Sequence, residues 1–278
     1  MAQKVDVMID VLHLFPMLDT ALINLLSELD QHQWNKDTLC RKWKVKDIAA
    51  HLLDGALRRL SAGRDSYLLP APEFGNYRDL VDYLNTLNAD WIQASKRLSP
   101  QIITEQLRQA QDQLFGYFSS LDPDAKAIFP VAWAGEHSSS NRFDIAREYT
   151  ERWHHQQQIR HAVGAESILT KQLYHPFLEI CMQALPYHYR NVEVSDGTLI
   201  RIEVVGESGG VWSIQQNLGV WSFSDSSAQA DTMVFIDENI AWMLFANNID
   251  AGEASQFWQV LGNRELGIHV LSMRTFMV

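Results

Sequence analysis

The spacing of the apolar residues changes once along this chain, near residue 190, and this change constrains the fold more than any other feature of the sequence. Before it, apolar residues recur three and four positions apart, which is the period of an amphipathic helix. After it, short runs rich in β-branched and aromatic residues are separated by Gly and Asp, which is typical of antiparallel strands. We therefore predict an α fold followed by an α+β fold: a four-helix bundle over residues 1–189, then a small domain with an antiparallel sheet over residues 190–278.

The helical part carries clear start and stop signals. Ser99 and Pro100 separate two of the patterns, because Ser is a good N-cap and Pro fits the first helical position. Gly164 ends a third, and Pro16 is expected to kink or split the first. The predicted helices cover residues 7–29, 45–60, 76–98, 100–121, 142–163 and 171–185. An up-and-down bundle is the natural packing for such helices.

The last part of the chain is expected to form four strands and two short helices. The strands are predicted over residues 198–205, 210–216, 220–224 and 231–236. The helices are predicted over residues 238–245 and 264–273, the second of them after the Gly262-Asn263 turn.

The charge balance excludes one large class of partners. The chain carries 34 acidic against 23 basic residues, a formal net charge of −11, and no run of Lys and Arg exceeds two residues. Duplex nucleic acid requires a basic face, so we expect no nucleic-acid partner. We also expect no membrane span, since no segment reaches the roughly 20 uncharged apolar residues that one needs. Cys40 and Cys181 lie far apart in the sequence and suggest neither a disulfide nor a cysteine metal site. We expect a cytoplasmic protein that is a monomer or a homodimer.

Two residues of the predicted helix 142–163 are suited to hold a metal ion. Glu151 and His155 lie four positions apart, so their side chains project from the same face. A third ligand must come from another helix, and His51 is a candidate because its neighbours on the helix face are apolar. Two imidazoles and one carboxylate leave open positions, as in catalytic zinc and non-haem iron sites. The same spacing also suits a solvated helix face, and a lone His on an apolar face can be a hydrogen-bonded core residue.

Neighbouring residues leave the ligand set open. His154 could pair with Glu151 at three positions, and Glu148 or His161 could serve if the helix face were rotated. An apolar stripe of this helix favours His155, because it leaves Glu151 and His155 together beside it. This stripe consists of Ile145, Tyr149 and Trp153.

The stretch from Trp43 to Leu52, WKVKDIAAHL, resembles the second-helix motif of the DinB-like metalloproteins, most closely that of the mycothiol-dependent maleylpyruvate isomerase family. A later helix of that family is similar to the set Arg147, Glu151, His155, Ile159, Ala162 and Gly164. The strands after residue 190 are similar to the family's sterol-carrier-like domain. The resemblance implies that His51, Glu151 and His155 bind one divalent metal, Zn²⁺ or alternatively Ni²⁺ or Fe²⁺. The chain departs from the family at Gln158, where Asp is frequent, and in extra residues around 61–77 and 166–190.

The resemblance also implies a reaction. In that family the metal binds a low-molecular-weight thiol such as mycothiol, because a divalent ion favours the thiolate and so supplies a nucleophile at neutral pH. For isomerisation, the thiolate would add to a cis double bond, let the new single bond rotate, and then leave. A dicarboxylate substrate must be held meanwhile, and an arginine matches a carboxylate. Arg264 and Arg147 are the candidates for this catalytic role, with Arg152 a further one, although surface arginines are common.

Three functions remain open at this stage. The first is a thiol-dependent isomerase or S-transferase, the second a metal-dependent hydrolase that activates water, and the third a non-catalytic small-molecule binding protein with a structural metal. Structural zinc usually has four protein ligands, which counts against the third. The aromatic residues Trp43, Trp133 and Trp153 are candidates for the wall of a pocket at the metal or for core packing.

Overall fold

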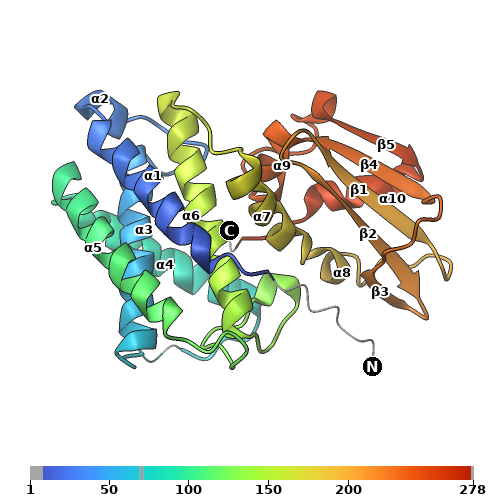
Figure 1. Ribbon diagram of the computed structural model, residues 1–278, viewed down its shortest axis with the longest axis horizontal. Helices are drawn as coiled ribbons and strands as arrows, with labels where there is room; N and C mark the ends of the chain where they lie inside the picture. Colours follow the sequence, from blue (N-terminus) through green and yellow to red (C-terminus); the bar gives the residue numbers. More distant parts are fainter. Residues whose placement is uncertain (1–8, 69, 71, 277–278) are drawn as a thin grey trace. The chain divides into compact units, whose positions relative to one another are not determined.

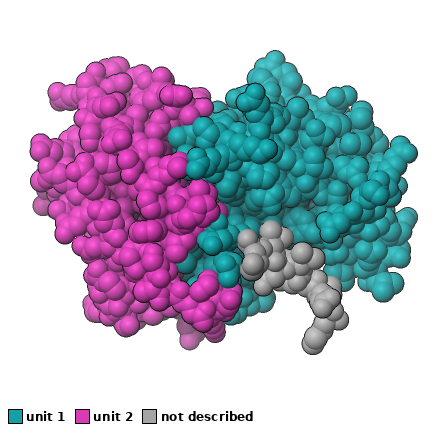
Figure 2. All heavy atoms as spheres, in the orientation of Figure 1, with its two compact units in different colours: residues 1–10, 129–150, 168–277 teal, residues 11–128, 151–167, 278 magenta. Residues whose placement is uncertain are grey.

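The structure is a computed structural model that describes residues 9–68, 70 and 72–276 (Figure 1). The chain divides into two compact units (Figure 2). One, the bundle unit, consists of residues 11–128 and 151–167; the other, the sheet unit, consists mainly of residues 129–150 and the chain from residue 168 onward. The long helix α6 (Asn141–Val163) therefore contributes to both units. The predicted domain boundary at residue 190 marks where the apolar spacing changes, and as a boundary it stays a prediction.

The bundle unit confirms the predicted helical bundle. Its long helices are α1 (Phe15–Glu28), α3 (Val45–Arg59), α4 (Tyr77–Ser95), α5 (Pro100–Ser119) and the second part of α6. The short elements are η1 (Leu12–Leu14), α2 (Gln31–Trp34) and the π-helical turn η2 (Leu60–Arg64), which continues α3. Helix α3 packs against both α4 and α5, and α1 packs against α5. The indole Nε1 of Trp91 on α4 donates a hydrogen bond to the carbonyl oxygen of Ala50 on α3, at 2.8 Å.

Local capping explains where these helices begin. The Ser99 hydroxyl accepts a hydrogen bond from the Ile102 amide at 3.2 Å, and Pro100 is the first residue of α5, as predicted. Pro16 lies in the first turn of α1, where its missing N–H costs nothing, so it splits the first predicted helix and does not kink it. The Lys44 amide donates to the Asp47 carboxylate at 3.0 Å and thereby fixes the start of α3.

The sheet unit confirms the predicted α+β fold. Its sheet has the strand order β3-β2-β1-β4-β5, with strands β1 (Leu199–Val205), β2 (Gly210–Asn217), β3 (Val220–Phe223), β4 (Thr232–Asp237) and β5 (Trp258–Gly262). Every second residue of β1, namely Ile200, Ile202 and Val204, is buried. The helical elements of this unit are η3 (Ala132–Ala134), α7 (Lys171–Met182), α8 (Leu185–His188), α9 (Glu238–Phe245), η4 (Ser255–Phe257), α10 (Arg264–Ile268) and η5 (His269–Ser272).

Two features of the sheet differ from the sequence expectation. Strand β5 is an additional edge strand, and the pairing of β1 with β4 is parallel whereas every other pairing is antiparallel. The burial of β5 alternates only weakly, and its apolar Leu261 is 48% exposed. Gly262 ends it with a φ of 89°, and a Cβ there would lie 2.1 Å from the Asp231 carbonyl oxygen, so only glycine fits. Within the described residues, no helix combines the length and apolar character that crossing a bilayer requires.

Candidate metal centre

The bundle unit brings together the three side chains singled out as metal ligands. His51 projects from α3, and Glu151 and His155 project from neighbouring turns of α6. One ligand atom of each lies within 4.8 Å of the other two, and this is the only such group of three or more among the residues that the structure describes. Within the group, His155 Nε2 and Glu151 Oε2 lie 3.4 Å apart.

These separations fit a small divalent cation. Zinc ligands lie about 2.0–2.2 Å from the ion, so two of them at a tetrahedral angle are roughly 3.4 Å apart. The Glu151 and His155 atoms already have this separation. Since no pair in the group exceeds 4.8 Å, the remaining ligand atom needs to move by no more than about 1.5 Å to reach this separation from both of the others. The side chain of Glu151 is 27% exposed and that of His155 only 9%, so solvent reaches the centre from the carboxylate side.

His51 is in the state that a metal requires. Burial, followed by the nearby charges of His155 and Arg58, lowers its pKa well below the usual range, so the imidazole is neutral and keeps a lone pair. Its Nδ1 atom is buried and has no hydrogen-bond partner among the described residues. An unsatisfied nitrogen in such a place costs free energy. Coordination of a cation by one of the two ring nitrogens would give this residue a role that its packing alone does not explain.

Gln158 fixes the orientation of the second imidazole. Its Oε1 lies 2.9 Å from Nδ1 of His155, one turn further along α6. With Oε1 as the acceptor, Nδ1 carries the proton and the lone pair of Nε2 points towards Glu151. Such a second contact is usual for metal-binding histidines. An amide thus occupies the place where the sequence resemblance suggested that Asp is frequent.

The alternative ligands lie elsewhere. The buried ring of His154 is 4.9 Å from that of His155 but is not part of the donor group. His161 is exposed near the end of α6. Glu148, in the sheet unit, forms an ion pair with Arg147 at 2.9 Å. The donor group among the described residues thus consists of His51, Glu151 and His155 and includes none of these three.

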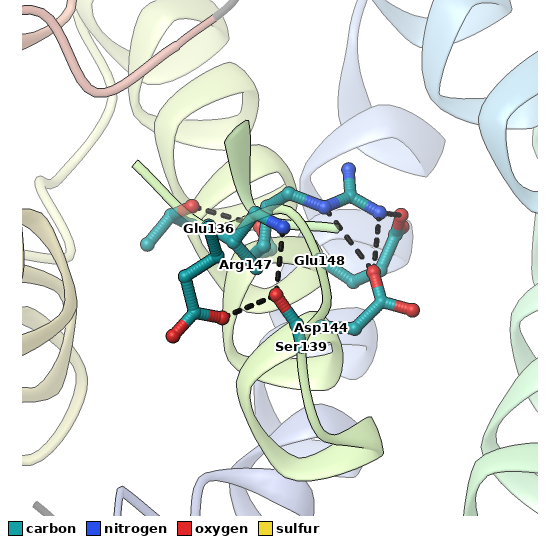
Figure 3. A network of polar contacts seen from close by, with 7 residues as sticks. Glu136, Ser139, Asp144, Arg147 and Glu148 are labelled. Carbon is teal, nitrogen blue, oxygen red and sulfur yellow. Dashed lines mark hydrogen bonds and ion pairs between the residues drawn. The ribbon is translucent and has the colours of Figure 1, made fainter. Parts of the chain in front are cut away.

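Arg147 lies among acidic groups of its own helix (Figure 3). Its Nη2 contacts the Asp144 carboxylate at 2.8 Å and the Glu148 carboxylate at 2.9 Å. Asp144 is fully buried, and an unpaired carboxylate would be costly to bury, so the ion pair with Arg147 stabilises the charge of Asp144. In the same network, Ser139 donates to Glu136 and accepts from the Val131 amide. The Arg147 guanidinium therefore already forms ion pairs with two carboxylates of the first part of α6.

The other two arginines differ in their surroundings. Arg152 is buried in the bundle unit, forms an ion pair with Asp19 on α1, and lies over the Phe15 ring at 4.7 Å. Arg264 is exposed at the first position of α10, with its guanidinium 5.5 Å from the Trp258 ring centroid. Within the described part of the chain Arg264 forms no ion pair, so it remains available to an anion.

The three candidate tryptophans also separate. Trp43 lies against the centre, with its ring centroid 4.7 Å from that of His51 and 6.2 Å from that of His155. Trp153 is fully buried, and Trp133 packs edge-on against Phe143 in the sheet unit.

Sequence reasoning missed Arg58, whose positive charge helps to lower the pKa of His51. Arg58 is held by Asp54 at 2.9 Å and by Asn88 at 3.2 Å. Its spacing from His51, seven positions along α3, was the available signal, because residues seven apart share a helix face.

Comparison with known proteins agrees with the fold. The family model of the mycothiol maleylpyruvate isomerase N-terminal domain matches residues 15–160, just over half of the chain. Two crystal structures of the mycothiol-dependent maleylpyruvate isomerase, one of them of a histidine-to-alanine mutant, match over 90% of both chains. Their TM-scores are 0.54 and 0.55 at 11% and 10% sequence identity, so this likeness shows the fold alone. No curated protein sequence matches the chain. The family match confirms the resemblance inferred from the two helix motifs, and the chain belongs to the family of proteins that carry a mycothiol maleylpyruvate isomerase N-terminal domain.

Proposed function

We propose that this chain is a metal-dependent enzyme that uses a low-molecular-weight thiol of the mycothiol type to isomerise a small dicarboxylate of the maleylpyruvate type. One observation carries the proposal: in a member of this family, two imidazoles and one carboxylate converge, and one of the imidazoles has a buried nitrogen without a partner among the described residues. Three protein ligands leave room for a further ligand from solution, as catalytic sites do.

Each residue has a separate task in this proposal. His51, Glu151 and His155 hold the metal, and Gln158 keeps Nε2 of His155 free of a proton. When bound, a divalent cation such as Zn²⁺ stabilises a thiolate over a thiol at neutral pH. Arg264, exposed and without an ion pair among the described residues, is our candidate to bind a substrate carboxylate. The cytoplasmic location belongs to the proposal as well, since both cysteines are free, as in a reducing compartment.

Thiol S-transfer is a second candidate, and the surroundings of Arg147 favour it. A dicarboxylate clamp built from two arginines would need Arg147, but Asp144 and Glu148 already neutralise its guanidinium. An S-transferase needs the thiol and an electrophile, and it has no use for two carboxylate contacts. The two reactions share the metal and the thiol, but isomerisation releases the thiol again whereas S-transfer leaves its sulfur bonded to the electrophile.

Metal content and thiol binding test the proposal together. Elemental analysis of the purified protein is expected to find about one divalent metal per chain, and His51→Ala is expected to lose it. His161→Ala is the matched control, because His161 is exposed on the same helix as two of the ligands and outside the donor group. Calorimetry of the zinc-loaded protein should show saturable binding of mycothiol.

Turnover assays then separate the reactions. Isomerisation of maleylpyruvate in the presence of mycothiol supports the first candidate, and consumption of the thiol with an electrophile supports the second. Absence of metal from the wild-type protein, or of binding by every thiol tested, would refute both. Hydrolysis of an ester or amide panel without any thiol would replace them by a metal-dependent hydrolase.

A further inference from the structure

The two imidazoles of the candidate centre are oriented by different means. His155 has a hydrogen bond from Nδ1 to Gln158 at 2.9 Å. Nδ1 of His51 has no counterpart to Gln158 among the described residues. Its ring instead contacts two other rings, Trp43 at 4.7 Å and His155 at 4.8 Å between centroids. Since His155 is itself a candidate ligand, Trp43 is, among the described residues, the one group outside the donor set whose ring contacts His51.

The position of Trp43 is fixed by the turn that precedes α3. The Trp43 amide donates to the Cys40 carbonyl oxygen at 2.7 Å, and the Thr38 hydroxyl donates to the Trp43 carbonyl oxygen at 2.7 Å. Directly after it, the Lys44 amide is bound by Asp47 at the start of α3. Hydrogen bonds therefore hold both the amide and the carbonyl oxygen of Trp43. The turn thus places the Trp43 indole just before α3, the helix that carries His51 about two turns further along.

We propose that Trp43 is a positioning residue of the metal centre, whose indole holds the His51 imidazole in the orientation of a ligand. This inference rests on the proposed function, because it presumes that His51 binds a metal. An aromatic neighbour restricts the rotation of the ring without requiring a hydrogen bond. An imidazole that coordinates a divalent cation also takes on partial positive charge, and the face of an indole attracts such charge more strongly than that of any other side chain.

A purely structural role for Trp43 makes a different prediction. Trp43 is partly exposed, so its replacement by a smaller residue leaves a shallow gap and no enclosed cavity. If Trp43 served packing alone, a variant would lower the melting temperature and leave the metal affinity of the folded protein unchanged. If it positions His51, the affinity must fall even where the fold is intact. Metal affinity is therefore the readout that separates the two roles.

The experiment compares three variants of the full chain, with Co²⁺ as the metal probe. Trp43→Leu is expected to bind Co²⁺ roughly 10–100-fold more weakly, the usual effect of removing a group that supports a metal ligand. Trp43→Phe, which keeps an aromatic face, should recover most of the affinity. Trp91→Phe is the matched control. It removes an indole that hydrogen bonds to α3 beside His51 but makes no ring contact with His51 among the described residues, so its affinity should equal that of the wild type.

Two further measurements keep the inference open to refutation. Co²⁺ should quench tryptophan fluorescence in the wild type more than in Trp43→Phe, because Trp43 is the indole at the centre. If Trp43→Leu does not fold, Thr38→Val serves instead: it removes the hydroxyl that holds the Trp43 carbonyl, should weaken Co²⁺ binding several-fold, and should be rescued by Thr38→Ser. Equal Co²⁺ affinity in the wild type, Trp43→Leu and Thr38→Val overturns the inference and leaves the proposed function standing. Absence of Co²⁺ and Zn²⁺ binding by the wild type overturns both.

Discussion

Replacing His51 by phenylalanine should change the stability of the protein in opposite senses with and without metal. In the metal-free protein, a buried unpartnered nitrogen costs about 1–3 kcal/mol. Because the His51 side chain is partly exposed, we take the lower end of this range, about 1 kcal/mol. Phenylalanine keeps a ring against Trp43 and removes the nitrogen. The metal-free variant should therefore be at least as stable as the wild type, by up to about 1 kcal/mol.

Metal should reverse this order. A ligand present at a hundred times its Kd stabilises the folded state by about 2.7 kcal/mol, and a protein that has lost a ligand gains far less. In a chain of this size, 1 kcal/mol corresponds to about 2–4 °C in Tm. Saturating Zn²⁺ should thus raise the Tm of the wild type by roughly 5–10 °C and that of the variant only slightly. The gain belongs to the transition of the bundle unit, because all three ligands lie within it.

Differential scanning calorimetry in a chelator and in excess Zn²⁺ measures both effects on one instrument. His161→Phe provides the matched control, since it also exchanges a histidine for a phenylalanine outside the donor group. The reasoning fails if metal-free His51→Phe is less stable than the wild type by several kcal/mol, because the unpartnered nitrogen would then carry no penalty. It also fails if Zn²⁺ raises the Tm of the wild type and of His51→Phe equally.

Three more predictions concern neighbouring contacts. Gln158→Leu removes the hydrogen bond to His155 and should weaken Zn²⁺ binding by roughly 10–100-fold in a competition titration, while Gln158→Asp should retain or increase the affinity. Burial lowers the pKa of His188 from 6.5 to about 4, so the unfolded chain binds more protons than the folded chain between these pH values. The free energy of unfolding should therefore fall by at most about 3 kcal/mol as the pH drops through this window. The fall should be smaller in His188→Gln, and urea unfolding measures both. Asp19→Ala leaves the buried guanidinium of Arg152 without its carboxylate and should cost about 3–5 kcal/mol in the same assay; a loss below 1 kcal/mol would mean that water already solvates this pair.

Helix ends were predictable from the sequence wherever the signal is local. Helix α5 begins at Pro100 behind the Ser99 cap, and α9 covers Glu238–Phe245 as expected. Strand β5 was not predictable in the same way, because its burial alternates only weakly and its apolar Leu261 is exposed. The parallel pairing of β1 with β4 follows from the path of the chain between them, which no local pattern records.

The candidate centre shows where spacing stops being informative. A separation of four positions placed Glu151 and His155 on one face of α6, and the apolar stripe beside them favoured His155 over His154. Two contacts in the structure support this choice. These contacts are the hydrogen bond to Gln158 and the approach of the His51 ring from α3, and the second of them exists only in the folded bundle. Sequence motifs could name His51 because they compare whole helices, whereas periodicity examines one helix at a time.

The two candidate arginines, Arg147 and Arg264, differ in the ion pairs that they form. Arg147 has acidic residues three positions before it and directly after it, Asp144 and Glu148, and a guanidinium on a helix pairs with such neighbours before any substrate arrives. Arg264 has its guanidinium over Trp258 and no ion pair in the described part of the chain. A carboxylate clamp needs an unmatched positive charge, because a guanidinium already neutralised gains little from a second anion. The ion pairs that an arginine forms are thus a better guide to its availability than its neighbours in the sequence. Arg264 is also followed by an acidic residue, Glu265, but forms no ion pair in the described part of the chain, which favours Arg264 over Arg147 as the residue that contacts substrate.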